Sequence, residues 1–278
     1  MIRTLQGLFL FCILTMFSAS CVFRSSVENK LGQAVPLPAY GSLEKFPFRE
    51  AWYGMYFHDD KVGYSHFKID PDGKNFTIAS DSFMRLAAPK RTDEIEMKEK
   101  VLVRPDITMI SFDSVVHMNG KEMKMIGRSE GDQLLVDIRV DGNTINRRYP
   151  LDGKVFHASA ISLMPALNGL KDGESHSFKV FNAEKQGMQN VDQEMFFVKG
   201  TPGPSGAVWK VKNKYGSSLV YSWLDDKGLA VIEKALTGAL ITLLEDESTA
   251  KDFLERKVPG KRAQLFGIIA NRLHSFPQ

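Results

Sequence analysis

Histidine is the residue type here best suited to metal binding or proton transfer. The six histidines are His58, His66, His117, His157, His176 and His274. His58 and His66 flank Asp59 and Asp60 in a predicted hairpin. If the turn has an even number of residues, the two histidines lie on opposite faces of the hairpin and cannot share a metal. If the number is odd, they lie on one face. No pair has a motif spacing such as HExxH. We therefore predict solvent-facing hairpin histidines, with no metal or cofactor.

Nucleophilic and acid–base catalysis have little support in the sequence. The two cysteines, Cys12 and Cys21, both precede the predicted folded part, and no G-x-S-x-G motif is present. Glu94 and Glu96 share one face of a predicted strand and could act as acid and base, but their neighbours are lysines and other solvent-type residues. We expect a non-catalytic protein, and keep a hydrolase acting on envelope polymers as an alternative.

The N-terminal residues have the pattern of a secretory signal peptide, residues 1–20. Arg3 precedes an apolar run at residues 8–17, which is shorter than the roughly 20 residues that span a bilayer. Small residues then lead to Cys21, as in a bacterial lipobox, although Ser18 stands where that pattern prefers Leu. We predict Cys21 as a lipid attachment site. The alternative is cleavage nearby, with Cys21 left as a free thiol.

A lipidated cysteine places the protein in the cell envelope. Val22 after the cysteine resembles an outer-membrane destination, so we expect attachment by N-terminal lipid at the periplasmic face of the outer membrane. Residues 21–46 are polar and small, with Pro36 and Pro38, and are predicted to be a lipidated, flexible tether. Residues 47–278 are predicted to form a single β-rich domain.

The charge distribution argues against nucleic acid as a partner. The formal net charge is +3, and basic residues alternate with acids, as in the segment RTDEIEMKEK at 91–100. Nucleic-acid binding proteins cluster their basic residues on one face. The chain is 43% hydrophobic and 25% charged, which is ordinary for a globular protein with a sizeable core.

Turn dipeptides and period-two alternation predict a sheet. Asn119-Gly120 and Asp141-Gly142 are hairpin signals, and the segments between such turns alternate apolar and polar residues. The fold class is mainly β, a large curved antiparallel sheet or half-barrel or sandwich with one inserted helix and a short C-terminal helix. The predicted strands are 51–58, 61–69, 75–86, 93–104, 107–118, 121–129, 132–140, 143–149, 175–182, 190–199, 206–214, 218–224, 229–236 and 239–245.

Apolar residues at helical spacing interrupt the strands at residues 157–173. Pro165 should kink or shorten this helix, and a second helix is predicted at 247–257. Methionines on neighbouring elements suit a surface that adapts to varied apolar ligands or partners, while ordinary core packing is the alternative. The residues predicted to line or support a ligand or partner surface are Trp52, Tyr56, Met123, Met125, Ile161 and Met164.

The segment AWYGMYFHDDKVGYSHFKI at 51–69 carries a W-x-G-x-Y pattern followed by K-x-G-Y. It resembles the start of the β-rich domain found upstream of transglutaminase-like cores in exported bacterial proteins. The matching positions are Trp52, Gly54, Tyr56, Lys61, Gly63 and Tyr64. The resemblance extends over nearly the whole mature chain and implies structural roles for these residues. The Cys, His and Asp of the catalytic core have no counterpart here, so its activity is not carried over.

These observations lead to one predicted function with two alternatives. We expect an exported envelope lipoprotein that acts as a non-catalytic binding or scaffolding module for a partner protein or peptide. The first alternative is a carrier of acyl chains or another hydrophobic ligand in the concave face of the sheet. The second is the hydrolase described above.

Overall fold

The computed structural model describes residues 37–58, 60–88, 91–169, 171–198 and 207–255. All of these belong to one compact unit, Gln33–Gln278. The predicted signal peptide, Cys21 and the first part of the predicted tether lie outside the described residues. Among the helices of the described part, none has the length and apolar character needed to cross a membrane.

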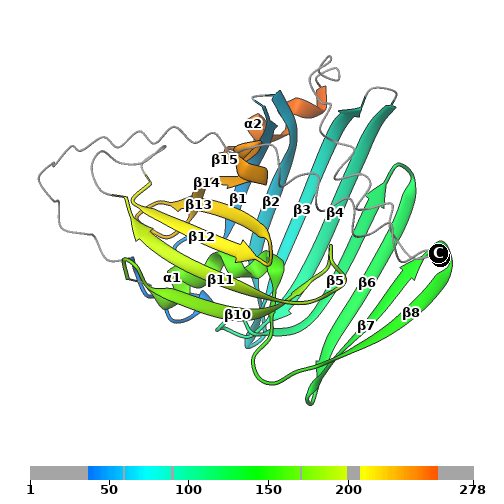
Figure 1. Ribbon diagram of the computed structural model, residues 1–278, viewed down its shortest axis with the longest axis horizontal. Coiled ribbons are helices and arrows are strands. Elements are labelled where there is room, and N and C mark those ends of the chain that lie inside the picture. The colour runs from blue at the N-terminus through cyan, green and yellow to red at the C-terminus, as the bar shows by residue number, and fades with distance from the viewer. Residues whose placement is uncertain (1–36, 59, 89–90, 170, 199–206, 256–278) are drawn as a thin grey trace, which may run out of the picture. The chain divides into compact units, whose positions relative to one another are not determined.

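Fifteen strands form one open sheet in the order β8-β7-β6-β5-β4-β3-β2-β1-β15-β14-β13-β12-β11-β10-β9, as Figure 1 shows. The mainly β fold class is confirmed. The strands are β1 (Glu50–Phe57), β2 (Asp60–Asp72), β3 (Asn75–Ala88), β4 (Arg91–Val103), β5 (Met109–Met118), β6 (Lys121–Glu130), β7 (Gln133–Val140), β8 (Asn143–Pro150), β9 (Phe156–His157), β10 (Ser175–Asn182), β11 (Gly187–Phe197), β12 (Trp209–Tyr215), β13 (Ser218–Leu224), β14 (Ala230–Ala235) and β15 (Leu240–Glu245).

Every predicted strand has a counterpart in the sheet, and one strand was missed. β9 has two residues and pairs in parallel with β10, so it is too short to show alternation. The hairpin turns at Asn119-Gly120 and Asp141-Gly142 have positive φ at both residues, between 50° and 79°. This is the backbone conformation that Asn, Asp and Gly tolerate best.

The two faces of the sheet differ in what covers them. Alternate residues of each strand, such as Val101 of β4 and Met125 of β6, point to the face that we call inner, where they join Ile161 and Met164 in one buried cluster. Figure 1 shows these short helical segments inside the curve of the sheet. The inner face therefore holds the core, and the opposite face is called outer.

The predicted tether is wrong for residues 37–46, which pack into this core. The 3-10 helix η1 (Leu43–Lys45) has Leu43 fully buried. The backbone N–H of Tyr40 donates to the carbonyl of Ala166 at 3.0 Å, and the N–H of Leu43 donates to the carbonyl of Pro105 at 2.9 Å. The apolar residues of this short segment outweigh its polar composition, because they find a partly filled inner face to cover.

The inserted helix is shorter than predicted. The helical part of this segment consists of the 3-10 helix η2 (Ala158–Leu163) and the single-turn helix α1 (Met164–Asn168). Pro165 stands in the first turn of α1, where its missing N–H costs nothing, and Gly169 ends the helix in the left-handed conformation. The C-terminal helix is α2 (Glu247–Lys251) followed by η5 (Asp252–Glu255), and Asp246 caps α2 by accepting from the Thr249 N–H at 2.9 Å.

Candidate functional site

The six residues predicted to line one surface lie on two sides of the sheet. Met123, Met125, Ile161 and Met164 share the buried inner cluster, and none is more than 4% exposed. Trp52 and Tyr56 belong to the alternate positions of β1 and lie on the outer face, beneath α2. The structure brings the first four together and does not bring Trp52 and Tyr56 to them.

On the outer face, Tyr56 and Lys61 hold one carboxylate. The Tyr56 hydroxyl donates to Glu245 Oε1 at 2.5 Å, and Lys61 Nζ lies 2.7 Å from Glu245 Oε2 and 3.2 Å from Asp252 Oδ1. Burial alone would lower the pKa of Lys61, but its hydrogen bonds to Glu245 and Asp252 hold that pKa above the ordinary value. A Cβ on Gly54 would lie 2.4 Å from Glu245 Oε2. These motif residues therefore fasten the C-terminal helix to the first hairpin.

Trp52 is also covered by its neighbours. Its ring stacks on His66 with centroids 3.9 Å apart, and Lys251 Nζ lies 4.3 Å from the Trp52 ring centroid. His66 Nε2 lies 2.8 Å from Glu50 Oε1. His58 stands in the β1–β2 turn with a φ of 46°, whereas His66 pairs across the hairpin with Trp52. In the described part of the chain, no three histidine, cysteine or acidic side chains are grouped as metal ligands.

Methionines instead gather on the inner face near the end of the sheet that carries the β1–β2 turn. In one register row, Met55 of β1 pairs with Gly63, Gly63 with Met84 of β3, and Met84 with Ile95 of β4. In the next row, Met97 of β4 pairs with Val116 of β5. Directly paired residues share a face. We call this set the methionine face: Met55, Met84, Ile95, Met97 and Val116.

The methionine face is partly exposed, whereas the inner-face rows under the short helices are buried. All five of its side chains are intermediate in exposure. Elsewhere on the inner face, Val101 of β4, Ile78 of β3 and Met125 of β6 are at most 2% exposed, in the cluster that also contains Ile161 and Met164 of the short helices. Long, unbranched methionine side chains adapt their shape to an apolar molecule that contacts them. This part of the curved sheet therefore offers an apolar surface that the chain's described elements leave incompletely covered.

A polar cluster separates the methionine face from the packed core. Glu99 of β4 accepts from the Ser114 hydroxyl at 3.3 Å and also bonds Ser80 and Ser159. The Ser159 hydroxyl lies 2.8 Å from His157 Nδ1. Glu99 is 5% exposed and His157 is 1% exposed. Burial raises the pKa of Glu99 and lowers the pKa of His157 to about 4, so both favour their neutral forms.

This cluster contains Ser, His and Glu but lacks the geometry of a catalytic relay. In a relay, the hydroxyl and the acid contact different nitrogens of the imidazole. Here Ser159 and Glu99 both face Nδ1 of His157, with Glu99 Oε2 at 4.0 Å. Nε2 of His157 is buried and has no hydrogen-bond partner among the described residues. The arrangement suits buried polar groups that satisfy one another.

The opposite wall of the sheet carries a similar polar set. Gln193 Nε2 donates to Asn213 Oδ1 at 2.8 Å, and the Ser222 hydroxyl donates to Glu233 Oε1 at 2.8 Å. Burial raises the pKa of Glu233 and that of Tyr53. Both walls therefore place a carboxyl group with a raised pKa on the inner face.

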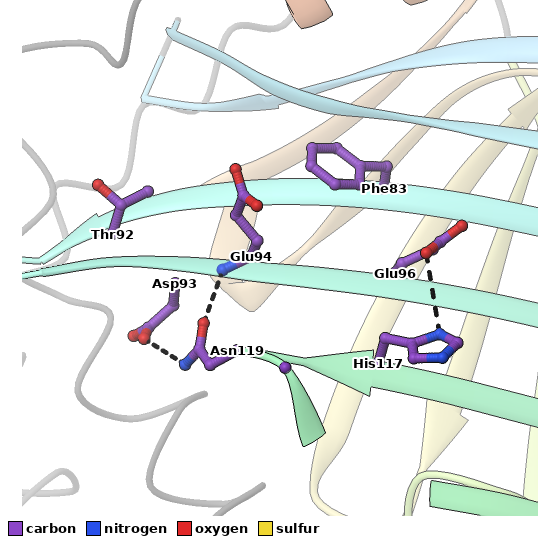
Figure 2. A pocket seen from close by; sticks show the side chains of 8 residues that line it. Phe83, Thr92, Asp93, Glu94, Glu96, His117 and Asn119 are labelled. Carbon is purple, nitrogen blue, oxygen red and sulfur yellow. Dashed lines mark hydrogen bonds and ion pairs between the residues drawn. The ribbon is translucent and has the colours of Figure 1, made fainter. Parts of the chain in front are cut away.

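The outer face has a shallow hollow of about 600 Å³, drawn in Figure 2. Asn119 Nδ2 donates to Asp93 Oδ1 at 2.7 Å, and Asn119 Oδ1 accepts from the Glu94 N–H at 3.0 Å. The predicted acid pair is held by cations, since Arg85 lies 2.8 Å from Glu94 and Lys98 lies 2.6 Å from Glu96. The residues lining the hollow are Phe83, Thr92, Asp93, Glu94, Glu96, His117, Asn119 and Gly120. The acidic side chains of this hollow are therefore paired with neighbouring cations or with Asn119.

Sequence reasoning missed Met55, Met84 and Met97. The alternation of apolar and polar residues could have placed each of them on the inner face. Each lies an even number of residues from a buried position of its own strand: Met55 from Tyr53, Met84 from Ile78, and Met97 from Val101. The prediction weighed methionines near the inserted helix, and those are the ones that the helix buries.

Comparison with known protein families and with curated proteins finds no match to this sequence. Among solved structures, the chain is similar to a beta-barrel-like protein of the domain of unknown function DUF1849 from Brucella abortus. The TM-score is 0.50 with 11% identity, covering 71% of this chain and 94% of that one. It is also compared with a DUF1089 family protein from Pseudomonas aeruginosa, at a TM-score of 0.37 with 12% identity, covering 62% of this chain and 89% of that one. The first likeness shows the fold alone.

Proposed function

We propose that this protein is a non-catalytic binding module whose inner sheet face takes a hydrophobic ligand with one or more acyl chains. The observation that carries the proposal is the partly exposed methionine face beside a fully packed core. Apolar side chains of an inner face are normally buried by the protein's own elements. Here Met55, Met84 and Ile95 are only partly buried where they pack against Phe57, Val62 and Leu86, which leaves the rest of their apolar surface for another molecule.

Two serines beside the methionine face support a ligand with a polar end. Ser65 and Ser82 are directly paired inner-face residues, and Ser82 pairs with Met97. Both serines are partly exposed. Hydroxyls beside an apolar surface can accept or donate hydrogen bonds to a ligand head group while the methionines contact its chain.

Native mass spectrometry of the chain from Val22, produced in a bacterial envelope, tests the proposal. We expect added mass that is released as phospholipid or fatty acid on denaturation. Limited oxidation with hydrogen peroxide gives an independent measure, because exposed methionines are converted to sulfoxides first. Met55, Met84 and Met97 should oxidise before the buried Met109 and Met125, and a bound fatty acid should slow their oxidation.

Matched variants on one strand separate ligand binding from stability. Met97→Gln places an amide on the methionine face, whereas Leu102→Gln makes a comparable change on the outer face of β4. Displacement of a fluorescent 16-carbon fatty acid should show weaker binding for Met97→Gln and unchanged binding for Leu102→Gln. Equal affinities for the two variants, or an apoprotein mass in every preparation, would contradict the proposal.

Export and lipid attachment at Cys21 are part of the same proposal and rest on the leader sequence. Labelling growing cells with an alkyne-tagged palmitate should modify the wild-type protein and leave Cys21→Ala unlabelled. Fractionation should place the labelled protein with outer membranes. Equal labelling of Cys21→Ala, or an unlabelled wild-type protein, would remove the lipid anchor from the proposal.

Partner binding by strand addition is a second candidate. Strand β8 stands at one end of the sheet order, and among the described strands it pairs only with β7. Six of its eight residues are exposed, including Arg147 and Arg148. A free edge with basic side chains can pair with an extended acidic segment of another protein. Crosslinking in cells from position 146 should then capture a partner that crosslinking from position 98 does not.

A further inference from the structure

Lysines lie beside apolar and aromatic side chains on the outer face of β12 and β13. Val211 and Ser222, which are buried and directly paired, point to the inner face, so the alternate residues of both strands point outward. Three lysines of β12 pair with three large side chains of β13: Lys210 with Trp223, Lys212 with Tyr221, and Lys214 with Leu219. We call these six residues, together with Lys234, the lysine–aromatic patch.

The ammonium groups are held against the aromatic rings. Lys210 Nζ lies 4.4 Å from the ring centroid of Tyr221 and 5.2 Å from that of Trp223. Lys234 of β14 lies 5.5 Å from the Trp223 centroid. Cations over ring faces keep their stems on the apolar surface and their charged ends beside it. The outer face of β12 and β13 therefore presents positive charges directly beside aromatic rings.

Exposed leucines mark one end of the patch. Leu219 is 40% exposed, and Leu236 of the 3-10 helix η4 (Leu236–Gly238) is 46% exposed. Helix η4 lies against β13. They are two of the three large apolar side chains that are exposed in the described part of the chain, and the third, Leu254, is in η5. Trp, Tyr, Leu and Lys in one patch are the composition of protein surfaces at the membrane–water interface.

The charge of the patch favours an anionic surface. Two acids of β11 face it: Glu194, whose Oε2 lies 3.1 Å from Lys212, and Asp192, which pairs with Lys214 and accepts from the Ser177 hydroxyl at 2.9 Å. The four lysines of the patch therefore outnumber the two carboxylates that face them, and the patch is positively charged. We infer that the lysine–aromatic patch docks the protein on a bilayer of anionic phospholipid, with the leucines and Trp223 at head-group level and the lysines on the phosphates.

Vesicle co-sedimentation tests this docking without any acyl anchor. The chain from Val22 retains the compact unit Gln33–Gln278 and carries no leader. It should bind vesicles of phosphatidylglycerol and phosphatidylcholine, bind weakly to phosphatidylcholine alone, and lose binding as salt rises. Lys210→Gln and Lys214→Gln should each weaken binding about fivefold. Leu219→Ser combined with Leu236→Ser should also weaken it at unchanged charge.

A charge-matched control separates the patch from net charge. Lys100→Gln and Lys121→Gln each remove one exposed lysine from the other half of the sheet and should each leave binding intact. Far-UV circular dichroism confirms that each variant is folded. Equal weakening by this control, or no dependence on phosphatidylglycerol, would overturn the docking surface. Complete competition by inorganic phosphate at constant ionic strength would assign the lysines to a free anion and overturn it as well.

Discussion

Replacing Lys61 with methionine should destabilise the protein strongly. The Lys61 side chain is 2% exposed, and Nζ contacts Glu245, Asp252 and the carbonyl of Thr249. Methionine keeps most of the apolar stem but removes the cation, leaving the Glu245 carboxylate, 11% exposed, without its ion pair. Breaking a buried pair in this way costs about 3–5 kcal/mol. For a chain of this size, such a loss lowers Tm by roughly 10 °C.

Urea unfolding followed by tryptophan fluorescence measures the loss, since Trp52 belongs to the same hairpin. The double variant Lys61→Met with Glu245→Gln should recover part of the stability, because the amide can still accept from the Tyr56 hydroxyl and no buried charge is left. We expect a coupling free energy of about 1–3 kcal/mol. A loss below about 1 kcal/mol for Lys61→Met, the range of exposed ion pairs, would refute the reasoning.

Four further predictions concern the inner face, the C-terminal helix and the free edge. The unfolded state binds a proton at His157 that the folded state does not, so stability should fall by about 3 kcal/mol from pH 6.5 to about pH 4, and His157→Phe should flatten this dependence in urea titrations. Glu99 should give the opposite pH dependence, because its raised pKa means that the folded state keeps a proton that the unfolded state loses. Stability should therefore fall as pH rises above 4.5 towards the folded-state pKa, and Glu99→Gln should remove this loss. Phe253→Ala, at a side chain 2% exposed, should cost about 3–5 kcal/mol in the same assay. Tyr149→Phe removes the hydroxyl that donates to the Gln186 carbonyl at 2.6 Å, and should raise amide exchange in β8 at a cost of about 1 kcal/mol.

Strand positions were predictable because their signal is local. Asn119-Gly120 and the alternation on either side of it fix a hairpin from a few neighbouring residues, whatever the rest of the chain does. Which face of the sheet a helix or loop covers, in contrast, depends on residues that are far apart in the sequence. Neither the packing of residues 37–46 under α1 nor the exposure of Met97 follows from neighbouring residues. Both depend on how far the short helices reach along the inner face.

Lys61 shows why the motif predicted a hairpin without predicting its contacts. By simple alternation, Lys61 and Gly63 share a face of β2, and Gly63 pairs with Met55 on the inner face. The register shifts between Met55 and Tyr56, so Lys61 pairs with Tyr56 and Val62 is the extra residue. This bulge turns the ammonium group to the outer face, where it meets Glu245.

The same bulge connects the two faces of the first hairpin. Without the extra residue, Val62 would stand opposite Tyr56 and Lys61 would point to the inner face beside Met55, because a slip of one residue exchanges the faces of a strand. A lysine there would place a charge on the methionine face and remove the cation that holds α2. One irregularity thus keeps lysine off the methionine face and fastens the C-terminal helix on the outer face. The glycines and aromatics of the motif are therefore best understood as positioning residues for the sheet, which leaves ligand contact to side chains outside the motif.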